Sequence, residues 1–273
     1  MSSGDLLLLN AALLIRMICT GAVVVGVSWA VGVFGPIVGG ALAGLPMVMA
    51  PAFLFLVQSS PVEFVSLTAT YTLISLAAIQ AFVLSYLLAS RRLSPWASLG
   101  VALCAWVVTA ALCRILPPSL WLGCLLFAAT TAGAIRVSRP YVDRTAVAKG
   151  KAGWATLLLR GALAGVMVAS ITTASGWLGA SSAGVLLAFP IGYTVIATTI
   201  HDKHGSPSVI ATLHAALLGG CSLAVFCFSV AILVWHLPPI WALLLAVGAS
   251  MATTLALVLR TRLAPRATGT TAL

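Results

Sequence analysis

The stretch GALAGLP, residues 40–46, places a proline inside an apolar run long enough to cross a membrane. Proline lacks a backbone N–H and clashes with the preceding turn of a helix. A second stretch, GVLLAFP, covers residues 184–190 and shares the pattern G-x-L-x-x-x-P. The two prolines, Pro46 and Pro190, lie 144 positions apart. The sequence therefore predicts that one segment of this chain is present twice.

The composition predicts an integral membrane protein built from α-helices. Of the 273 residues 62% are hydrophobic and 7% are charged, and a soluble protein of that make-up would expose large apolar patches. A β-barrel would instead show alternating segments of about ten residues. The expected partner is the lipid bilayer. The net charge of +10 does not indicate nucleic acid, because the basic residues lie between the apolar runs.

Nine apolar runs are long enough to be transmembrane helices. Seven of the eight tryptophans lie near the predicted ends of these runs, as expected for a side chain that favours the membrane interface, and only Trp106 lies in the middle of one. Pro117 and Pro118 divide the fourth run from the fifth. The predicted helices cover residues 12–34, 37–57, 64–89, 96–116, 119–136, 154–178, 182–201, 208–235 and 239–260.

Basic residues between these helices fall almost entirely on one side of the membrane. With nine crossings, Arg114 is alone on its side, and the other side receives Arg91, Arg92, Arg136, Arg139, Arg144, Lys149, Lys151, Lys203, Arg260, Arg262 and Arg266. Positive charge marks the cytoplasmic side. We therefore expect a multi-pass protein of the bacterial inner (plasma) membrane, with its N-terminus outside and its C-terminus in the cytoplasm.

The duplication extends well beyond the two prolines. Residues 13–57 align without gaps to residues 157–201, and eleven of the 45 pairs are identical, including Arg16 with Arg160, four glycine pairs and the two prolines. A looser match follows at an offset near 146, where SPVEFVSLTA is paired with SPSVIATLHA. Apolar composition alone would not align an arginine, a proline and several glycines.

The two copies are expected to face opposite ways, because five predicted helices separate Arg16 from Arg160 and five is odd. The predicted fold is an all-α membrane bundle with an inverted 4+1+4 repeat. Its parts are a first four-helix repeat at 1–116, a connector helix and basic loop at 117–153, and a second repeat at 154–273. Many secondary transporters use such inverted repeats for alternating access.

The paired prolines are candidates for a transport site. Pro46 would leave the carbonyl of Leu42 without its helical donor, and Pro190 would do the same to Leu186. A carbonyl without a donor must face protein, water or a ligand in lipid. Pro51 predicts a second break in the same helix as Pro46. The alternative is a plain packing kink, with small residues that let neighbouring helices approach.

Three further residues are candidates for substrate binding. Arg16 and Arg160 lie about one turn inside their helices, where each guanidinium either reaches the headgroups or binds an anion. His214 lies in a predicted helix and either carries a proton or makes a structural hydrogen bond. The four acidic residues all lie outside the middle of the predicted helices, which argues against a proton relay through a carboxylate.

These observations favour a transporter over an enzyme. The helices contain no paired carboxylates, no cluster of metal ligands and no nucleophile motif, so no cofactor or metal is expected. The predicted function is a secondary transporter or facilitator of a small anionic or amphiphilic solute by alternating access. The alternatives are a channel, a lipid scramblase or a non-transporting membrane subunit.

The repeat unit resembles small bacterial inner-membrane proteins of the GlpM-like type. The resemblance rests on an arginine followed by glycine-spaced apolar residues and then AGLP or LAFP in the next helix, and it covers residues 13–57 and 157–201. It implies that the chain is similar to two such four-helix units fused through a connector. The resemblance implies no particular activity.

Overall fold

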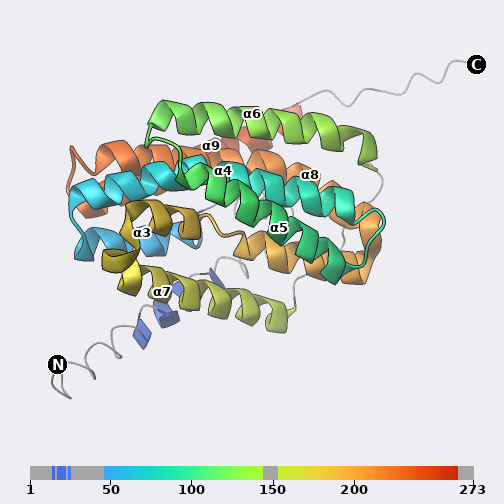
Figure 1. The fold of residues 1–273 in the computed structure, drawn as a ribbon, viewed down its shortest axis with the longest axis horizontal. Helices are drawn as coiled ribbons and strands as arrows, with labels where there is room; N and C mark the ends of the chain where they lie inside the picture. Colours follow the sequence, from blue (N-terminus) through green and yellow to red (C-terminus); the bar gives the residue numbers. More distant parts are fainter. Residues whose placement is uncertain (1–13, 16, 23, 26–45, 144–152, 264–273) are drawn as a thin grey trace, which may run out of the picture.

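The computed structural model describes residues 14–15, 17–22, 24–25, 46–143 and 153–263. Every regular element in this part of the chain is a helix, so the all-α prediction is confirmed for it. The helices lie side by side with their long axes nearly aligned (Figure 1). Residues 14–25 are helical where they are described. The remaining elements are α3 (Met49–Ser59), α4 (Val62–Ala89), α5 (Pro95–Arg114), α6 (Leu120–Ser138), the 3-10 turn η1 (Arg139–Tyr141), α7 (Trp154–Leu187), α8 (Ile191–Leu233) and α9 (Pro239–Leu263).

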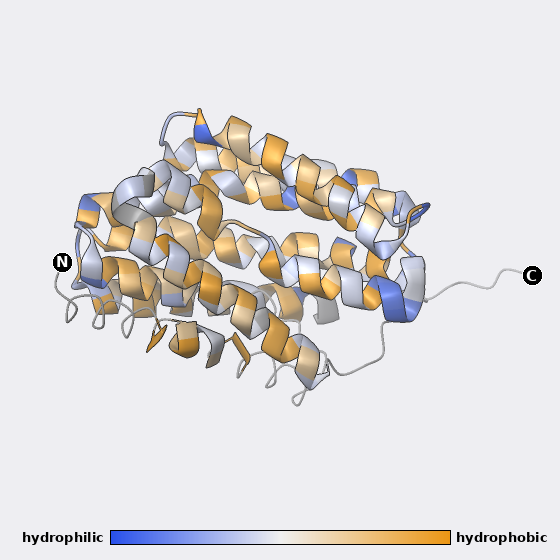
Figure 2. Cartoon of the chain, turned by 60° about the horizontal axis from the view of Figure 1, so that its bottom comes forward, coloured by the Kyte–Doolittle hydropathy of each residue, from blue (hydrophilic) through white to orange (hydrophobic). Residues whose placement is uncertain are grey.

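Length and hydropathy make this a multi-pass membrane protein. Six helices in the described residues are long and apolar enough to cross a bilayer. Hydrophobic residues surround the helices rather than facing only inward (Figure 2). Large apolar side chains are openly exposed, including Trp177 at 96% and Ile115 at 78%. A surface of that kind requires lipid around it.

Part of the difference between this count of six and the nine predicted helices lies outside the described residues, which leave out most of the predicted helix 12–34 and residues 37–45 of the next. Two further reasons are visible in the described residues. The helix α3 has 11 residues and is too short to cross a bilayer. The apolar stretch Gly179–Leu233 has 55 residues and counts as one helix, although about 20 residues suffice for one crossing. That stretch is interrupted before Ile191 and again at Gly205.

The chain reverses direction at Gly205. Residues 180–204 run parallel to α4, because Gly184 packs on the backbone of Thr68 near the start of α4, and His201 contacts Tyr86 near its end. Residues 206–233 run antiparallel to α4, because the hydroxyl of Ser66 donates to the carbonyl of Ala231 at 2.7 Å near the far end of α8. The helix α8 is therefore two segments that meet at a bend.

The central helix of the bundle is α4. In its most apolar window 72% of residues are buried by protein, compared with 22% for α6 and 28% for α5 and α9. Polar contacts join α4 to its neighbours within the apolar core. The amide nitrogen of Gln80 donates to the hydroxyl of Thr131 on α6 at 2.9 Å and to the carbonyl of Leu217 on α8 at 3.2 Å. Polar groups this deep need such partners, because lipid offers none.

Helix boundaries agree with the predicted ones where local chemistry sets them. Pro117 and Pro118 separate α5 from α6, as predicted. Ser94 caps α5 by accepting a hydrogen bond from the N–H of Ala97 at 3.4 Å, and Ser119 caps α6 by accepting one from the N–H of Leu122 at 3.4 Å. These two caps fix the hairpins that place α5 and α6 beside α4.

Two predicted features of the helices are wrong. The predicted bounds 182–201 are wrong, because helix α7 ends at Leu187 and α8 begins at Ile191, although the interruption predicted at Pro190 is present. The predicted second break at Pro51 is absent, because α3 continues through it. Pro51 lies in the first turn of α3, where a backbone N–H has no intrahelical acceptor and its loss is harmless.

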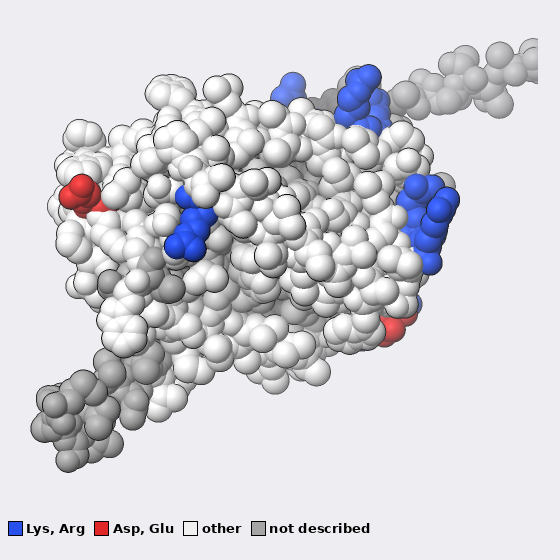
Figure 3. Space-filling view, in the orientation of Figure 1, with Lys and Arg blue, Asp and Glu red and all other residues white. Residues whose placement is uncertain are grey.

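Basic side chains gather toward the right-hand end of the face shown in Figure 3. The guanidinium of Arg91, just after α4, stacks over the ring of Tyr141 at 3.9 Å from its centroid. This cation–π contact joins the end of α4 to the end of α6. It places positive charge where both helices leave the apolar region, as expected for the end of a bundle at the headgroups.

Candidate functional site

Pro46 and Pro190 line the same pocket. The cavity has a volume of about 100 Å³ and lies where the start of α3 meets the start of α8. Helix α4 contributes one wall through Ile79, and α8 contributes another through Leu223. The other lining residues are Met47, Val48, Met49, Leu187, Phe189, Ile191, Gly192, Tyr193 and Ile196. The structure thus brings together two of the residues that the sequence singled out.

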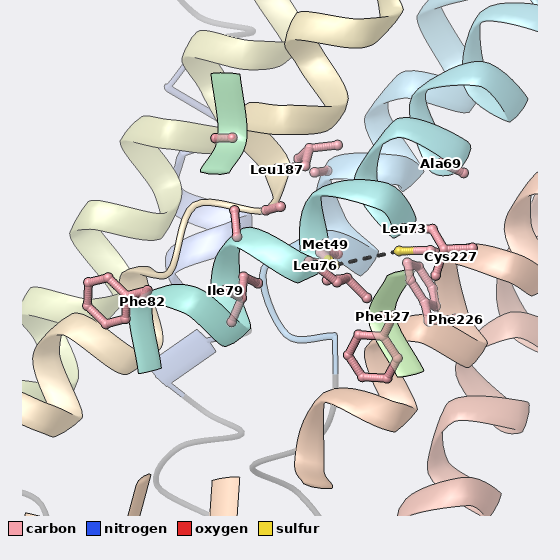
Figure 4. Close-up of a cluster of buried hydrophobic side chains, with 14 of the residues drawn as sticks. Met49, Ala69, Leu73, Leu76, Ile79, Phe82, Phe127, Leu187, Phe226 and Cys227 are labelled. Atoms are coloured by element: carbon pink, nitrogen blue, oxygen red, sulfur yellow. Dashed lines mark hydrogen bonds between the residues drawn. The ribbon is translucent and has the colours of Figure 1, made fainter. Parts of the chain in front are cut away.

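Each proline lies at the start of a helix and not within one. The carbonyl of Pro46 accepts a hydrogen bond from the N–H of Ala50 at 2.7 Å, and the carbonyl of Pro190 accepts one from the N–H of Thr194 at 2.9 Å. Proline is suited to this position because its fixed φ favours a helix start and its missing N–H is not needed there. Figure 4 shows Met49, Ile79 and Leu187 in the same apolar cluster beside this junction.

The chain between α7 and α8 forms a tight turn. The N–H of Phe189 donates to the carbonyl of Leu186 at 2.9 Å, and the N–H of Ile191 donates to the carbonyl of Phe189 at 2.9 Å. The prediction that Leu186 lacks a donor is therefore wrong. Pro190 ends the helical pattern, but the tightened last turn supplies Leu186 with a donor from three residues later.

The carbonyl of Ala188 receives its donor from another helix. The indole nitrogen of Trp106 on α5 donates to this oxygen at 3.1 Å. The Trp106 ring also packs edge-on against Phe189, with ring centroids 4.9 Å apart and planes at 83°. Trp106 is 7% exposed. One buried side chain thus satisfies the open carbonyl and supports a residue that lines the pocket.

The sequence alone did not assign Trp106 to this site, although the position of this tryptophan in the sequence is unusual. It is the single tryptophan predicted in the middle of a helix, away from the interface that indole favours. An indole N–H at that depth needs an acceptor, and helical carbonyls are already bonded. A broken helix offers the free carbonyl that is required. The sequence did not reveal which broken helix Trp106 would reach.

The pocket combines apolar walls with two helix N-termini. The described residues that line it carry no charged side chain, and Tyr193 has the one hydroxyl among them. Gly192 and Tyr193 lie in the first turn of α8, where backbone N–H groups lack an intrahelical acceptor. The helix dipoles of α3 and α8 add partial positive charge at the same place. Chemically, this arrangement suits a solute with an apolar body and an anionic or polar end.

The other predicted site residues do not join this pocket in the described structure. Arg16 and Leu42 lie outside the described residues. Arg160 belongs to α7, and Leu186 lies one residue before the lining residue Leu187. The Nδ1 atom of His214 lies 2.7 Å from the hydroxyl of Ser138 at the end of α6, so its observed contact is to another helix. No group of three metal-ligating side chains occurs in the part of the chain that the structure describes.

No family model, curated protein or solved structure matches this chain. The likeness of the repeat unit to GlpM-like proteins therefore stays a prediction.

Proposed function

We propose that this protein is a secondary transporter that binds its solute in the pocket between Pro46 and Pro190. The observation that carries the proposal is that Pro46 and Pro190, 144 residues apart in sequence, line one cavity at the starts of two helices, α3 and α8. Interrupted membrane helices at matching places in two halves are typical of transporter binding sites. Substrate binding at such a junction uses backbone groups that a continuous helix would not offer.

A pair of glycine contacts supports an inverted repeat. A Cβ on Gly21 would lie 3.3 Å from the carbonyl oxygen of Gly161, and a Cβ on Gly165 would lie 2.5 Å from the carbonyl oxygen of Met17. At the repeat offset of 144, Met17 corresponds to Gly161 and Gly21 to Gly165. Replacing each residue of the Gly21–Gly161 contact by its counterpart in the other copy therefore gives the Gly165–Met17 contact. Two helices related in this way cross antiparallel about a local two-fold axis, as inverted copies would.

The central helices support the same relation. At the offset of 146, the break between α3 and α4 at Ser60 corresponds to the bend beside Ser206. The hydrogen bonds from Ser66 to Ala231 and from Gln80 to Leu217 show that α4 packs antiparallel to residues 206–233. The proposed second repeat thus reproduces a short helix, a break and a long helix in the same order as the first.

The proposal retains nine crossings in a 4+1+4 arrangement. Its domains are 1–116, 117–153 and 154–273, with the C-terminus in the cytoplasm of a bacterium. Residues 180–204 and 206–233 then count as two crossings, and α3 is the second half of an interrupted one. The basic ends of α4, α6 and α9 would lie together on the cytoplasmic side.

The favoured solute is a small amphiphilic anion. The apolar lining would bury a hydrocarbon part, and the backbone N–H groups of Gly192 and Tyr193 in the first turn of α8 would bind a carboxylate or similar group. Arg16 and Arg160 are proposed to attract the anion at the two entrances. A strongly charged solute is disfavoured, because the described lining has no charged side chain to neutralise it.

Cysteine accessibility in proteoliposomes tests the proposal before the solute is known. Met49→Cys and Ile191→Cys place a thiol in the lining, on a background from which the six native cysteines have been removed. Alternating access predicts that a water-soluble thiol reagent modifies both positions from either side of the membrane. Val108→Cys, on the exposed face of α5, is the control and should stay unmodified in lipid. Modification from one side alone would contradict alternation.

Solute flux then separates the carrier from its alternatives. A panel of linear and branched monocarboxylates is compared with alcohols of the same carbon number. A carrier predicts saturable uptake and counterflow for some of the anions, whereas a channel or scramblase predicts flux without counterflow. No flux, together with one-sided cysteine modification, would favour a non-transporting membrane subunit.

A further inference from the structure

Two glycines in an unusual backbone conformation bracket residues 180–204. Gly179 has φ 68° and ψ 162°, and Gly205 has φ 77° and ψ 179°. Among the described residues no other has a positive φ. This region of backbone space is essentially restricted to glycine. Both bends therefore depend on the absence of a side chain.

Neither bend is held by close packing. A Cβ on Gly179 would meet nothing within 4 Å, and one on Gly205 would approach only the Cδ of Pro207, at 3.9 Å. The glycines are thus needed for their backbone angles and not for space. An open bend made by glycine is a suitable hinge, because the backbone can change its angles there without displacing neighbours.

Two side chains of the bundle hold the segment between these glycines. The indole nitrogen of Trp106 donates to the carbonyl of Ala188 at 3.1 Å. Ala188 lies in the turn between the end of α7 and the start of α8. The hydroxyl of Tyr86 lies 3.3 Å from the Nδ1 atom of His201 at its end, and the two rings meet edge-on with centroids 5.9 Å apart. Both Trp106 and Tyr86 are buried. These two polar contacts tie the segment to α5 and to α4 at separate points, in addition to the packing of Gly184 on α4.

We infer that residues 180–204 move as one unit on Gly179 and Gly205, and that Trp106 and Tyr86 hold this unit in the position seen here. The inference rests on the proposed function for its purpose, since the segment carries Phe189, Pro190 and Tyr193 into the pocket wall. Movement of the segment away from α4 would open the pocket toward one side. Trp106 is thus a positioning residue for the site.

Hydrogen exchange of the full-length protein in lipid nanodiscs tests the inference without a solute. Trp106→Phe removes the N–H donor and keeps an aromatic ring. We expect backbone exchange in residues 180–204 to become about tenfold faster, the factor that follows from losing one hydrogen bond of ordinary strength. Exchange in α4 and α6 should remain at the wild-type rate. Trp96→Phe is the matched control, because Trp96 lies on the same helix and is 75% exposed. It should leave backbone exchange unchanged in residues 180–204 and in α4 and α6.

A second variant tests the other attachment independently. Tyr86→Phe removes the hydroxyl beside His201 and should speed backbone exchange across 180–204, again without a change in α6.

Unchanged exchange in this segment for both variants would overturn the inference, as would an equal increase throughout α4, α5 and α6. If the segment responds as a unit but no solute is transported, the hinge stands and the carrier proposal fails. If flux is found but the segment does not respond, the hinge fails alone.

Discussion

Gly184 allows residues 180–204 to pack closely against the central helix, α4. A Cβ on Gly184 would lie 2.7 Å from the carbonyl oxygen of Thr68 and 2.9 Å from the backbone nitrogen of Thr72. Backbone atoms cannot turn aside as a flexible side chain can, so any larger residue would push the two helices apart. Gly40, the partner of Gly184 in the proposed repeat, lies outside the described residues.

Replacing Gly184 with alanine should therefore destabilise the protein. Overpacking of this kind costs about 1–3 kcal/mol in the free energy of unfolding. Gly133→Ala on α6 is the matched control, because a Cβ there meets nothing within 4 Å. The control should be neutral or stabilising by up to about 1 kcal/mol, from helix propensity. Denaturation in mixed micelles measures both variants, and equal stability for the two would show that the close approach does not matter.

The paired arginines carry a prediction about transport. If Arg16 and Arg160 attract an anion to the two entrances, Arg16→Ala and Arg160→Ala should each raise the half-saturating solute concentration in proteoliposomes. Lysine replacements should restore only part of the loss, because lysine keeps the charge but not the planar, forked hydrogen-bonding geometry. Saturable flux that is unaffected by both alanine variants would end the anion-attraction hypothesis and leave headgroup binding as their role.

At the scale of elements, α4 is held by a few polar contacts set in an apolar core. Gln80 is 3% exposed and joins three helices, since its amide reaches Thr131 on α6 and Leu217 on α8. In lipid the hydrophobic effect does little to hold helices together, so such hydrogen bonds and close packing define the arrangement. The contact between Gln80 and Thr131 also fixes the rotation of α4, which sets the direction of Ile79 in the pocket wall.

A double-mutant cycle tests this contact. Gln80→Leu combined with Thr131→Val should show a coupling energy of about 0.6 kcal/mol, with an upper bound near 1.7 kcal/mol, the range known for hydrogen bonds between membrane helices. Thr130→Val provides the control, because the hydroxyl of Thr130 bonds to the carbonyl of Leu126 within its own helix. Its coupling with Gln80→Leu should be close to zero. Equal coupling for Thr130 and Thr131 would contradict a direct contact.

The sequence predicted those helix positions that depend on local chemistry. The predicted range 154–178 ends where Gly179 bends the chain, and Pro117 and Pro118 divide α5 from α6. It also directed attention to Pro46 and Pro190, which proved to line one cavity. That meeting depends on how two distant segments pack, which periodicity does not encode. For the same reason the sequence missed the bond from Trp106 to Ala188, a contact across 82 residues.

At the scale of the whole molecule, the proposed transporter depends on two copies of one segment facing opposite ways. The antiparallel packing at Gly21 and Gly161, and the antiparallel packing of α4 against residues 206–233, are both expected of this arrangement. Such an arrangement is also compatible with the starts of α3 and α8 lining one pocket. Copies that faced the same way would place their interrupted helices parallel to each other.

The most direct test labels equivalent positions in the two copies. Ser59 and Lys203 correspond at the offset of 144, and both are exposed at the ends of their helices. Ser59→Cys and Lys203→Cys are made separately in a cysteine-free background and treated with an impermeant maleimide. An inverted repeat predicts that Ser59→Cys reacts in right-side-out membrane vesicles and Lys203→Cys in inside-out vesicles. Reaction of both thiols from the same side of the membrane would contradict the inverted repeat and the transport mechanism built on it.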